Sequence, residues 1–152
     1  MKIPSLRFAA DVPDHWLDRS SFAFLVPPDG SIAEPRAKQP KEPTPPASVV
    51  IQWREPPANM TSLGDFLEAQ IPEMQAAFAG LVVVERGDDG TDEEPAPFLD
   101  CRLPGNQPLR QLIVARLVQG QLVLLTGTAQ ELQFASMKKH FLAVVKSMRP
   151  AA

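Results

Sequence analysis

The sequence has a single cysteine, Cys101, and no tyrosine among its 152 residues. One thiol cannot form a disulfide within the chain, so the fold must depend on a hydrophobic core, and a reducing compartment suits it. The longest apolar runs, near residues 112–118 and 122–125, are far shorter than the roughly 20 residues that a membrane-spanning helix needs. We therefore expect no stable insertion in a membrane.

Signals for export and for polyanionic partners are also missing. Residues 1–13 contain no apolar stretch of the roughly 7–15 residues found in a secretory signal. The net charge is −3 and the isoelectric point is near 5.4, which argues against nucleic acid or an anionic membrane as the main partner. These observations predict a cytoplasmic protein that binds no nucleic acid.

The usual sequence patterns of catalysis and metal binding are absent. The two histidines, His15 and His140, fall in different predicted elements, and neither has a neighbour at metal-ligand spacing. The acidic segment 87–97 lacks the spacing of a calcium loop and is typical of a hairpin connection. Cys101 is best interpreted as a small buried hydrophobic residue. We expect no enzymatic activity, no metal and no cofactor.

What the chain does contain is enough apolar sequence for one globular domain. Hydrophobic residues make up 44% of the sequence, and the length suits a single domain over residues 1–152. Seven of the 17 prolines lie in residues 27–46, together with charges of both signs. That composition predicts an exposed, extended loop. Binding of its proline spacings to a polyproline-binding groove is the less favoured alternative.

The order of the predicted elements indicates an α+β fold. A run of strands is followed by a helix at residues 62–79, further strands joined by hairpins, and a last helix at residues 129–148. This order predicts a mainly antiparallel sheet with two main helices. The predicted strands are residues 5–12, 20–26, 47–54, 81–85, 98–103, 109–118 and 121–128.

Each predicted helix has its own start signal. Ser62 followed by Asp65 indicates a side-chain cap for the first helix, and Thr128 followed by Glu131 indicates a capping box for the second. Pro72 falls about ten residues into the first helix, where it removes a hydrogen bond and clashes with the preceding turn. We expect a kink there, or two short helices.

Two strands are unusual because both of their faces are uncharged. In residues 21–26 the second face carries Ser21, Ala23 and a leucine, and in residues 47–54 it includes Val50. Single glutamines interrupt two further apolar patterns, Gln70 on the first helix and Gln111 on the strand at 109–118. Spacing alone leaves two interpretations open. Either the glutamines are satisfied within a packed core, or they face a surface that binds an apolar partner with polar groups of its own.

Several segments, in the same order, resemble DcrB-like domains. The segment VPDHWLDRS followed by an aromatic strand resembles the opening of that family, and LGDFLEAQ resembles its first helix. LRQLIVARLVQGQLVLLTGTA resembles its central hairpin, and KSMRP resembles its ending. The resemblance covers nearly the whole chain and implies a PsbP-like α/β sandwich.

The branch of this family without a signal peptide includes the Eag chaperones of bacterial type VI secretion. The resemblance implies a homodimer that shields the N-terminal transmembrane helices of an effector with a PAAR spike domain before it is loaded on the secretion spike. The alternative is a PsbP-like scaffold or interaction domain for a folded soluble partner. Carried over position by position, the resemblance implies that the cargo-binding residues are Gln70, Gln111, Met74, Phe78, Ser21, Ala23 and Val50.

Overall fold

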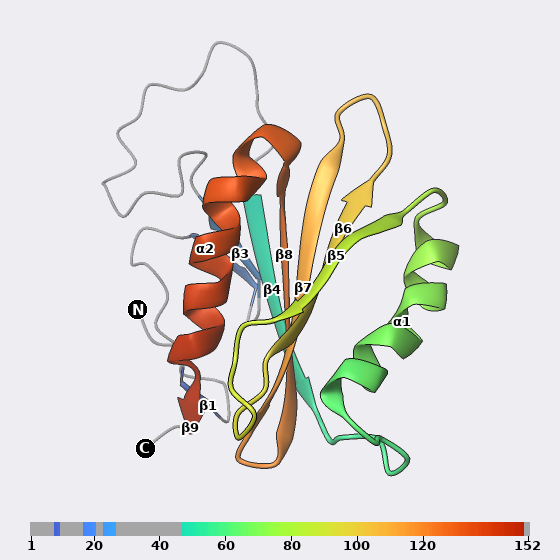
Figure 1. Ribbon diagram of the computed structural model, residues 1–152. Helices are drawn as coiled ribbons and strands as arrows, with labels where there is room; N and C mark the ends of the chain where they lie inside the picture. Colours follow the sequence, from blue (N-terminus) through green and yellow to red (C-terminus); the bar gives the residue numbers. More distant parts are fainter. Residues whose placement is uncertain (1–7, 10–16, 21–22, 27–46, 151–152) are drawn as a thin grey trace.

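The computed structural model describes residues 8–9, 17–20, 23–26 and 47–150. In this part of the chain an antiparallel seven-stranded sheet, in the order β2-β3-β4-β8-β7-β6-β5, carries one helix on each face (Figure 1). The predicted α+β class is confirmed. The elements are β1 (Phe8–Ala9), β2 (Leu17–Ser20), β3 (Ala23–Val26), β4 (Ala47–Arg54), α1 (Leu63–Ala77), β5 (Val82–Asp88), β6 (Pro97–Leu103), β7 (Leu109–Val118), β8 (Gln121–Gln130), α2 (Glu131–Ser147) and β9 (Arg149–Pro150), with β1 paired to β9.

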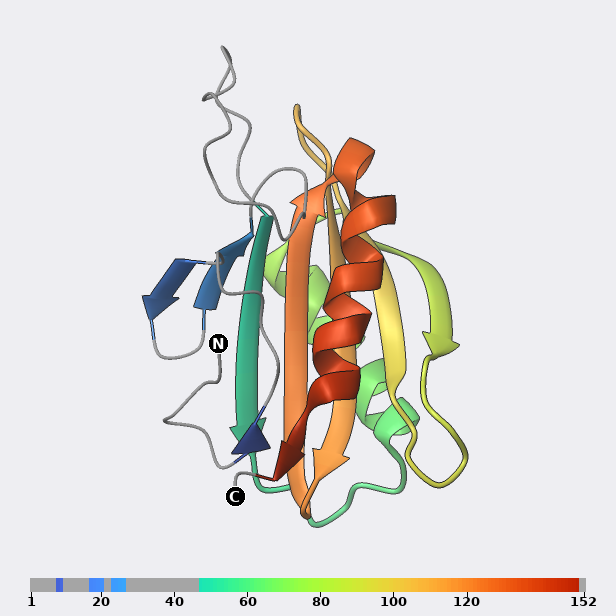
Figure 2. The same ribbon diagram turned by 90° about the vertical axis from the view of Figure 1, so that its left-hand side faces the viewer.

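One core lies between the sheet and α2, which runs along the sheet over β8 and β7 (Figure 2). Alternate residues of the strands point to this side, and the helix adds an apolar stripe at helical spacing. A Cβ on Gly127 would lie 2.5 Å from the ring of Phe141, so the glycine allows the helix to approach the sheet closely. The central side chains of this core are Val49, Ile51, Leu112, Val114, Val123, Leu125, Phe134, Met137 and Phe141.

A second core lies between α1 and the strands β6 and β7. Leu63, Phe66 and Leu67 of α1 are buried against apolar side chains of the sheet. Because β7 is covered by α2 on one face and by α1 on the other, its central residues 112–115 are buried on both faces. The sheet residues of this core are Leu99, Cys101, Leu103, Ile113, Ala115 and Leu122.

The start of α1 confirms the predicted cap, since the backbone N–H of Asp65 donates to Ser62 Oγ at 3.0 Å. The expectation of two short helices is wrong, because α1 is one helix that contains Pro72. Pro72 lies on the exposed side of the helix. There, water can hydrate the carbonyl of Glu68, which loses its partner in the helix, so the proline costs less than it would against the sheet.

The start of α2 corrects a second expectation. Thr128 is not a helix cap but a strand residue that pairs with Gln111, and β8 continues to Gln130 before the helix begins at Glu131. The local capping signal was outweighed by the ladder of hydrogen bonds to β7. At the other end of α2, Arg116 donates to the carbonyls of Val145 and Met148 at 2.7 and 3.0 Å, which gives partners to acceptors that a helix end leaves free.

The strands predicted at residues 47–54 and 109–118 are confirmed with the same bounds. The predicted strands 81–85, 98–103 and 121–128 correspond to β5, β6 and β8 with shifted ends. The acidic connection is confirmed as a hairpin, in which Asp88 Oδ1 accepts hydrogen bonds from the N–H groups of Gly90 and Ala96, both at 2.8 Å. The predicted proline-rich loop at 27–46 and His15 lie outside the described residues, and so do parts of the strands predicted at 5–12 and 20–26.

Candidate binding face

The side of the sheet that carries α1 is covered unevenly. The close contacts of α1 are mainly with β6 and β7, and few are with β4 and β8. Most side chains of β4 and β8 that point to this side are half-buried or exposed, whereas their neighbours on the α2 side, such as Val49 and Leu125, are at most 1% exposed. We call this region the open face, and its residues are Ser48, Val50, Gln111, Leu124, Thr126 and Thr128.

The open face begins with a row of polar side chains. Ser48, Thr128 and Gln111 lie directly opposite one another on β4, β8 and β7. Gln111 Nε2 donates to Thr128 Oγ1 at 3.3 Å, so the amide has one partner within the domain. The next row, Val50, Thr126 and Ile113, is more apolar. The result is a surface without charge that still offers hydroxyl and amide groups to a partner.

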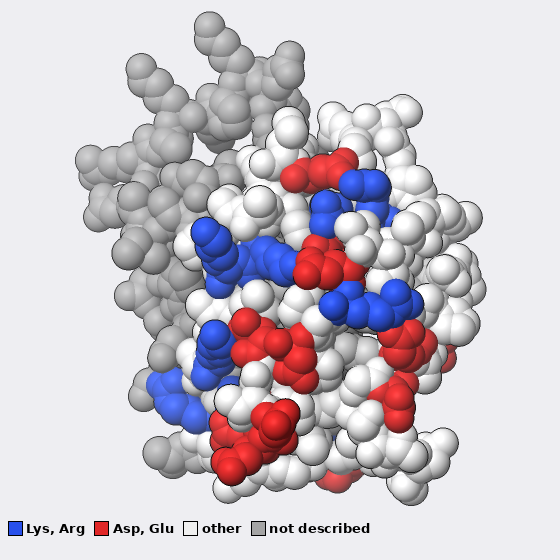
Figure 3. Space-filling model, in the orientation of Figure 1, with Lys and Arg blue, Asp and Glu red and all other residues white. Residues whose placement is uncertain are grey.

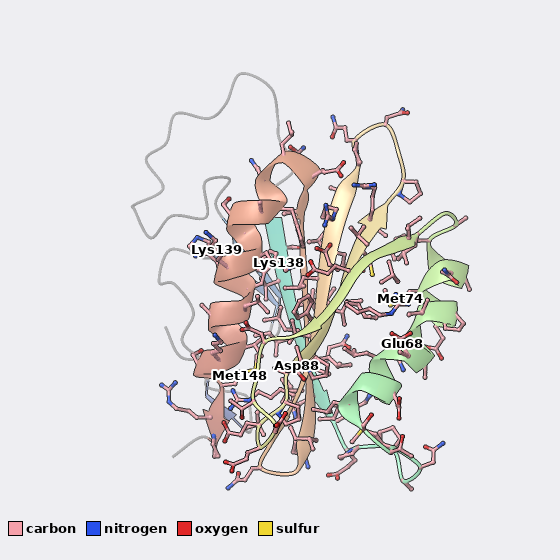
Figure 4. All side chains as sticks on the ribbon, in the orientation of Figure 1. Glu68, Met74, Asp88, Lys138, Lys139 and Met148 are labelled. Atoms are coloured by element: carbon pink, nitrogen blue, oxygen red, sulfur yellow. The ribbon has the colours of Figure 1, made fainter. Side chains whose placement is uncertain are left out.

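The adjacent helix contributes two of the predicted residues. Gln70 and Met74 are half-buried and one turn apart on α1, and Met74 packs against the second core on the side of α1 that faces the sheet (Figure 4). Gln70 makes no side-chain hydrogen bond to any residue in the described part of the chain. The amide of Gln70 therefore has no hydrogen-bond partner among the described residues, whereas the amide of Gln111 donates to Thr128.

The structure places four of the seven predicted residues on one side of the sheet, namely Val50, Gln70, Met74 and Gln111. The backbone of Ala23 pairs with Val50 in register, and Ser21 lies outside the described residues. Phe78 follows the last turn of α1 and is 48% exposed. It is close in sequence to Val82 and Val84, which are also exposed, at the edge strand β5.

Sequence reasoning missed a cluster of charges on the α2 side of the sheet. Figure 3 shows acidic and basic side chains alternating over the side of the molecule where α2 and β5 lie. At its centre Asp100, which is 2% exposed, accepts from Arg110 Nη2 at 2.7 Å and lies 3.5 Å from Lys138 Nζ. Lys138 also pairs with Glu85 at 3.0 Å. A signal was present in the sequence, because Asp100 interrupts the otherwise apolar start of β6.

Most ion pairs of the described residues thus lie on the α2 side of the sheet, away from the open face. The cluster around Asp100 is internally paired, and the rings of Phe134 and Phe98 stack against Arg110 and Lys138 at 4.6 Å. These contacts hold α2 to the sheet and leave little charge for a ligand. No group of three metal-binding side chains occurs in the part of the chain that the structure describes. Among the described helices, none is long and apolar enough to cross a bilayer.

Cys101 lies in the second core and is fully buried, as expected. Burial raises the pKa of its thiol to about 11. At pH 8 the native thiol should react with an aromatic disulfide reagent about 100-fold or more slowly than in the unfolded chain, because the thiolate is the nucleophile. The control is the same reaction in guanidinium chloride. Equal rates in the two conditions would contradict the buried position.

The same pKa sets a direction for stability. The unfolded thiol ionises near pH 8.5, whereas the native thiol stays protonated until about pH 11. Below about pH 8.5 the thiol therefore leaves the free energy of unfolding unchanged. As the pH rises from about 8.5 toward 11, the unfolded chain loses this proton and the native protein keeps it, so the free energy of unfolding should fall.

Comparison with solved structures identifies the fold. Cyanobacterial PsbP (CyanoP) from Synechocystis sp. PCC 6803 aligns with a TM-score of 0.64 and 13% identity, covering 95% of this chain and 87% of that chain. A protein of unknown function, PA94 from Pseudomonas aeruginosa, aligns with a TM-score of 0.61 and 17% identity, covering 95% and 92%. The Ran-binding protein Mog1p from Saccharomyces cerevisiae aligns with a TM-score of 0.56 and 9% identity, covering 93% and 89%.

The chain is therefore an α+β protein with the PsbP-like fold, as expected from the sequence. At these identities the likeness concerns the fold alone. No protein-family profile matches the sequence. No curated protein shows significant similarity to it.

Proposed function

We propose that this protein is a chaperone and adaptor that shields an apolar N-terminal helix of a secreted protein. In the form that the sequence resemblance suggests, the cargo is a type VI secretion effector with a PAAR domain, and the chaperone holds its transmembrane segment in the cytoplasm until the effector is loaded on the spike. It acts as a homodimer, without catalysis, metal or cofactor.

The observation that carries this proposal is the open face. Its half-buried valine and leucine can contact apolar side chains of a helix, and its small hydroxyl residues allow a helix backbone to approach closely, as between transmembrane helices. Gln111 is part of this face and Gln70 lies on α1, on the same side of the sheet, and both amides can bond to polar groups of the cargo. The second core and the charge cluster offer no comparable surface, because one is covered by α1 and the other is internally paired.

The two glutamines test the proposal. In co-expression with the first about 60 residues of the cognate effector, enough for one or two membrane spans, Gln70→Ala should weaken pull-down of the segment and barely change the melting temperature. The amide of Gln70 has no partner in the described structure, so its loss leaves no buried group unpaired. Gln111→Ala should weaken pull-down as well, with a destabilisation of about 1 kcal/mol from the lost bond to Thr128.

Gln107→Ala is the matched control, because Gln107 is exposed in the connection between β6 and β7 and is not one of the open-face residues. It should leave both pull-down and melting unchanged. Lower stability with unchanged pull-down in the Gln70 and Gln111 variants would refute the cargo-binding role. Both residues would then belong to the packing of the domain.

A scaffold or interaction domain for a soluble, folded protein is the second candidate. It is favoured by the fold likeness to Mog1p, which is named a Ran-binding protein. The two functions differ in the state of the partner. A chaperone of this kind captures an isolated apolar segment, whereas a scaffold binds its partner only when the partner is folded.

A further inference from the structure

The α1-facing side of β4, β7 and β8 carries one positively charged side chain, which lies at one end of these strands. On β4, β7 and β8 the residues in register with the open face are serine, threonine, glutamine and apolar residues, with one exception. The exception is Arg54, the last residue of β4, which pairs with Leu122. The opposite end of the surface is the uncharged row of Ser48, Thr128 and Gln111.

Arg54 bridges the sheet and the helix. The Cζ atom of Arg54 lies 4.9 Å from the centroid of the Phe66 ring on α1. The guanidinium therefore extends from β4 toward α1 and stacks on the Phe66 ring. It forms no ion pair with any described residue. A guanidinium stacked on an aromatic ring keeps its N–H donors in the plane of the group, where they can still meet an anion.

The dimensions suit a short helical segment. Arg54 and Ser48 are six residues apart on β4, which corresponds to about 20 Å along the strand. A helix of about 13 residues has that length. Such a helix carries a partial negative charge at its C-terminal end, and an acidic side chain there adds a full one.

We propose that Arg54 sets the direction in which the bound segment lies, by pairing with an acidic residue at the C-terminal end of an apolar helix. This inference rests on the proposed function and specifies its ligand. The acidic end lies at Arg54, and the apolar body lies along Val50 and Thr126 toward the row that contains Gln111. A segment with a basic C-terminal flank should bind more weakly.

The test uses two synthetic peptide probes with the same apolar helical body of 13 alanines and leucines, a number taken from the helix rise. One ends in two aspartates and the other in two lysines. Fluorescence anisotropy should show that the wild-type protein prefers the acidic probe about fivefold, in line with a partly exposed ion pair. The preference should reverse in Arg54→Glu and persist in Arg54→Lys.

Lys139→Glu is the matched control, because it makes the same change of charge on the exposed side of α2. It should keep the wild-type preference. Equal binding of the two probes by the wild type, or an unchanged preference in Arg54→Glu, would overturn the role of Arg54 and leave the proposed function standing. If neither probe binds, the proposed function fails, and this inference fails with it.

Discussion

Replacing Val50 with glutamate is expected to abolish capture of the effector segment and to leave the domain folded. Val50 is half-buried at the centre of the open face, so a carboxylate there can reach water when the face is empty. Under a bound apolar helix the same carboxylate would be desolvated without a partner, at a cost of several kcal/mol. We expect the affinity to fall by about 100-fold or more, measured by pull-down and by anisotropy with the acidic probe.

Val84→Glu is the control for this substitution. Val84 is a valine of the edge strand β5 and is 45% exposed, outside the open face. It makes the same chemical change and should leave capture unchanged. Loss of binding in both variants, or in neither, would contradict the assignment of the cargo to the open face. Circular dichroism and thermal melting show whether either variant is unfolded.

The second large effect is expected for stability. Asp100→Ala should lower the free energy of unfolding by about 3–5 kcal/mol, because it removes one partner from a buried ion pair. The carboxylate accepts both Arg110 Nη2 contacts at 2.7 Å, and the Arg110 side chain is only 15% exposed. Without Asp100 the guanidinium would remain desolvated next to Phe134, with Glu131 at 3.8 Å as its nearest ion-pair partner. Denaturation in urea measures the change.

Two further variants separate burial from charge. Glu85→Ala removes the exposed partner of Lys138, and it should cost less than about 1 kcal/mol because water screens that pair. The double variant Asp100→Leu with Arg110→Leu should recover much of the loss, since apolar residues can replace a buried pair. A similar loss in Glu85→Ala and Asp100→Ala would contradict the buried role of Asp100.

The alternation of apolar residues predicted the element order well. The strands 47–54 and 109–118 have the predicted bounds, since their alternating pattern is continuous and turn residues flank them. The cap at Ser62 was also predictable, because it depends on contacts three residues apart. The start of α2 was not, because Thr128 has a competing partner, Gln111, 17 residues earlier in the chain.

The candidate site was predicted only in part, because local patterns single out its residues but do not place them together. Gln70 and Gln111 attract notice as single amides in apolar patterns, and Val50 as a member of an uncharged second face. Their position on one side of the sheet depends on the strand order, which joins β4 to β8 and β8 to β7. Strand order is a property of long-range pairing, and no local pattern encodes it.

By itself the sequence determined the α+β class, a single buried thiol, the polar interruptions and the lack of a catalytic pattern. These features follow from composition and from periods of 2 and 3.6 residues, which act over neighbouring positions. Only the tertiary structure decided that α1 covers β6 and β7 and leaves β4 and β8 half-exposed. It also decided that Asp100 meets Arg110 and Lys138, and that Arg54 reaches Phe66. Each of these contacts joins different elements, so it exists only once the sheet has assembled.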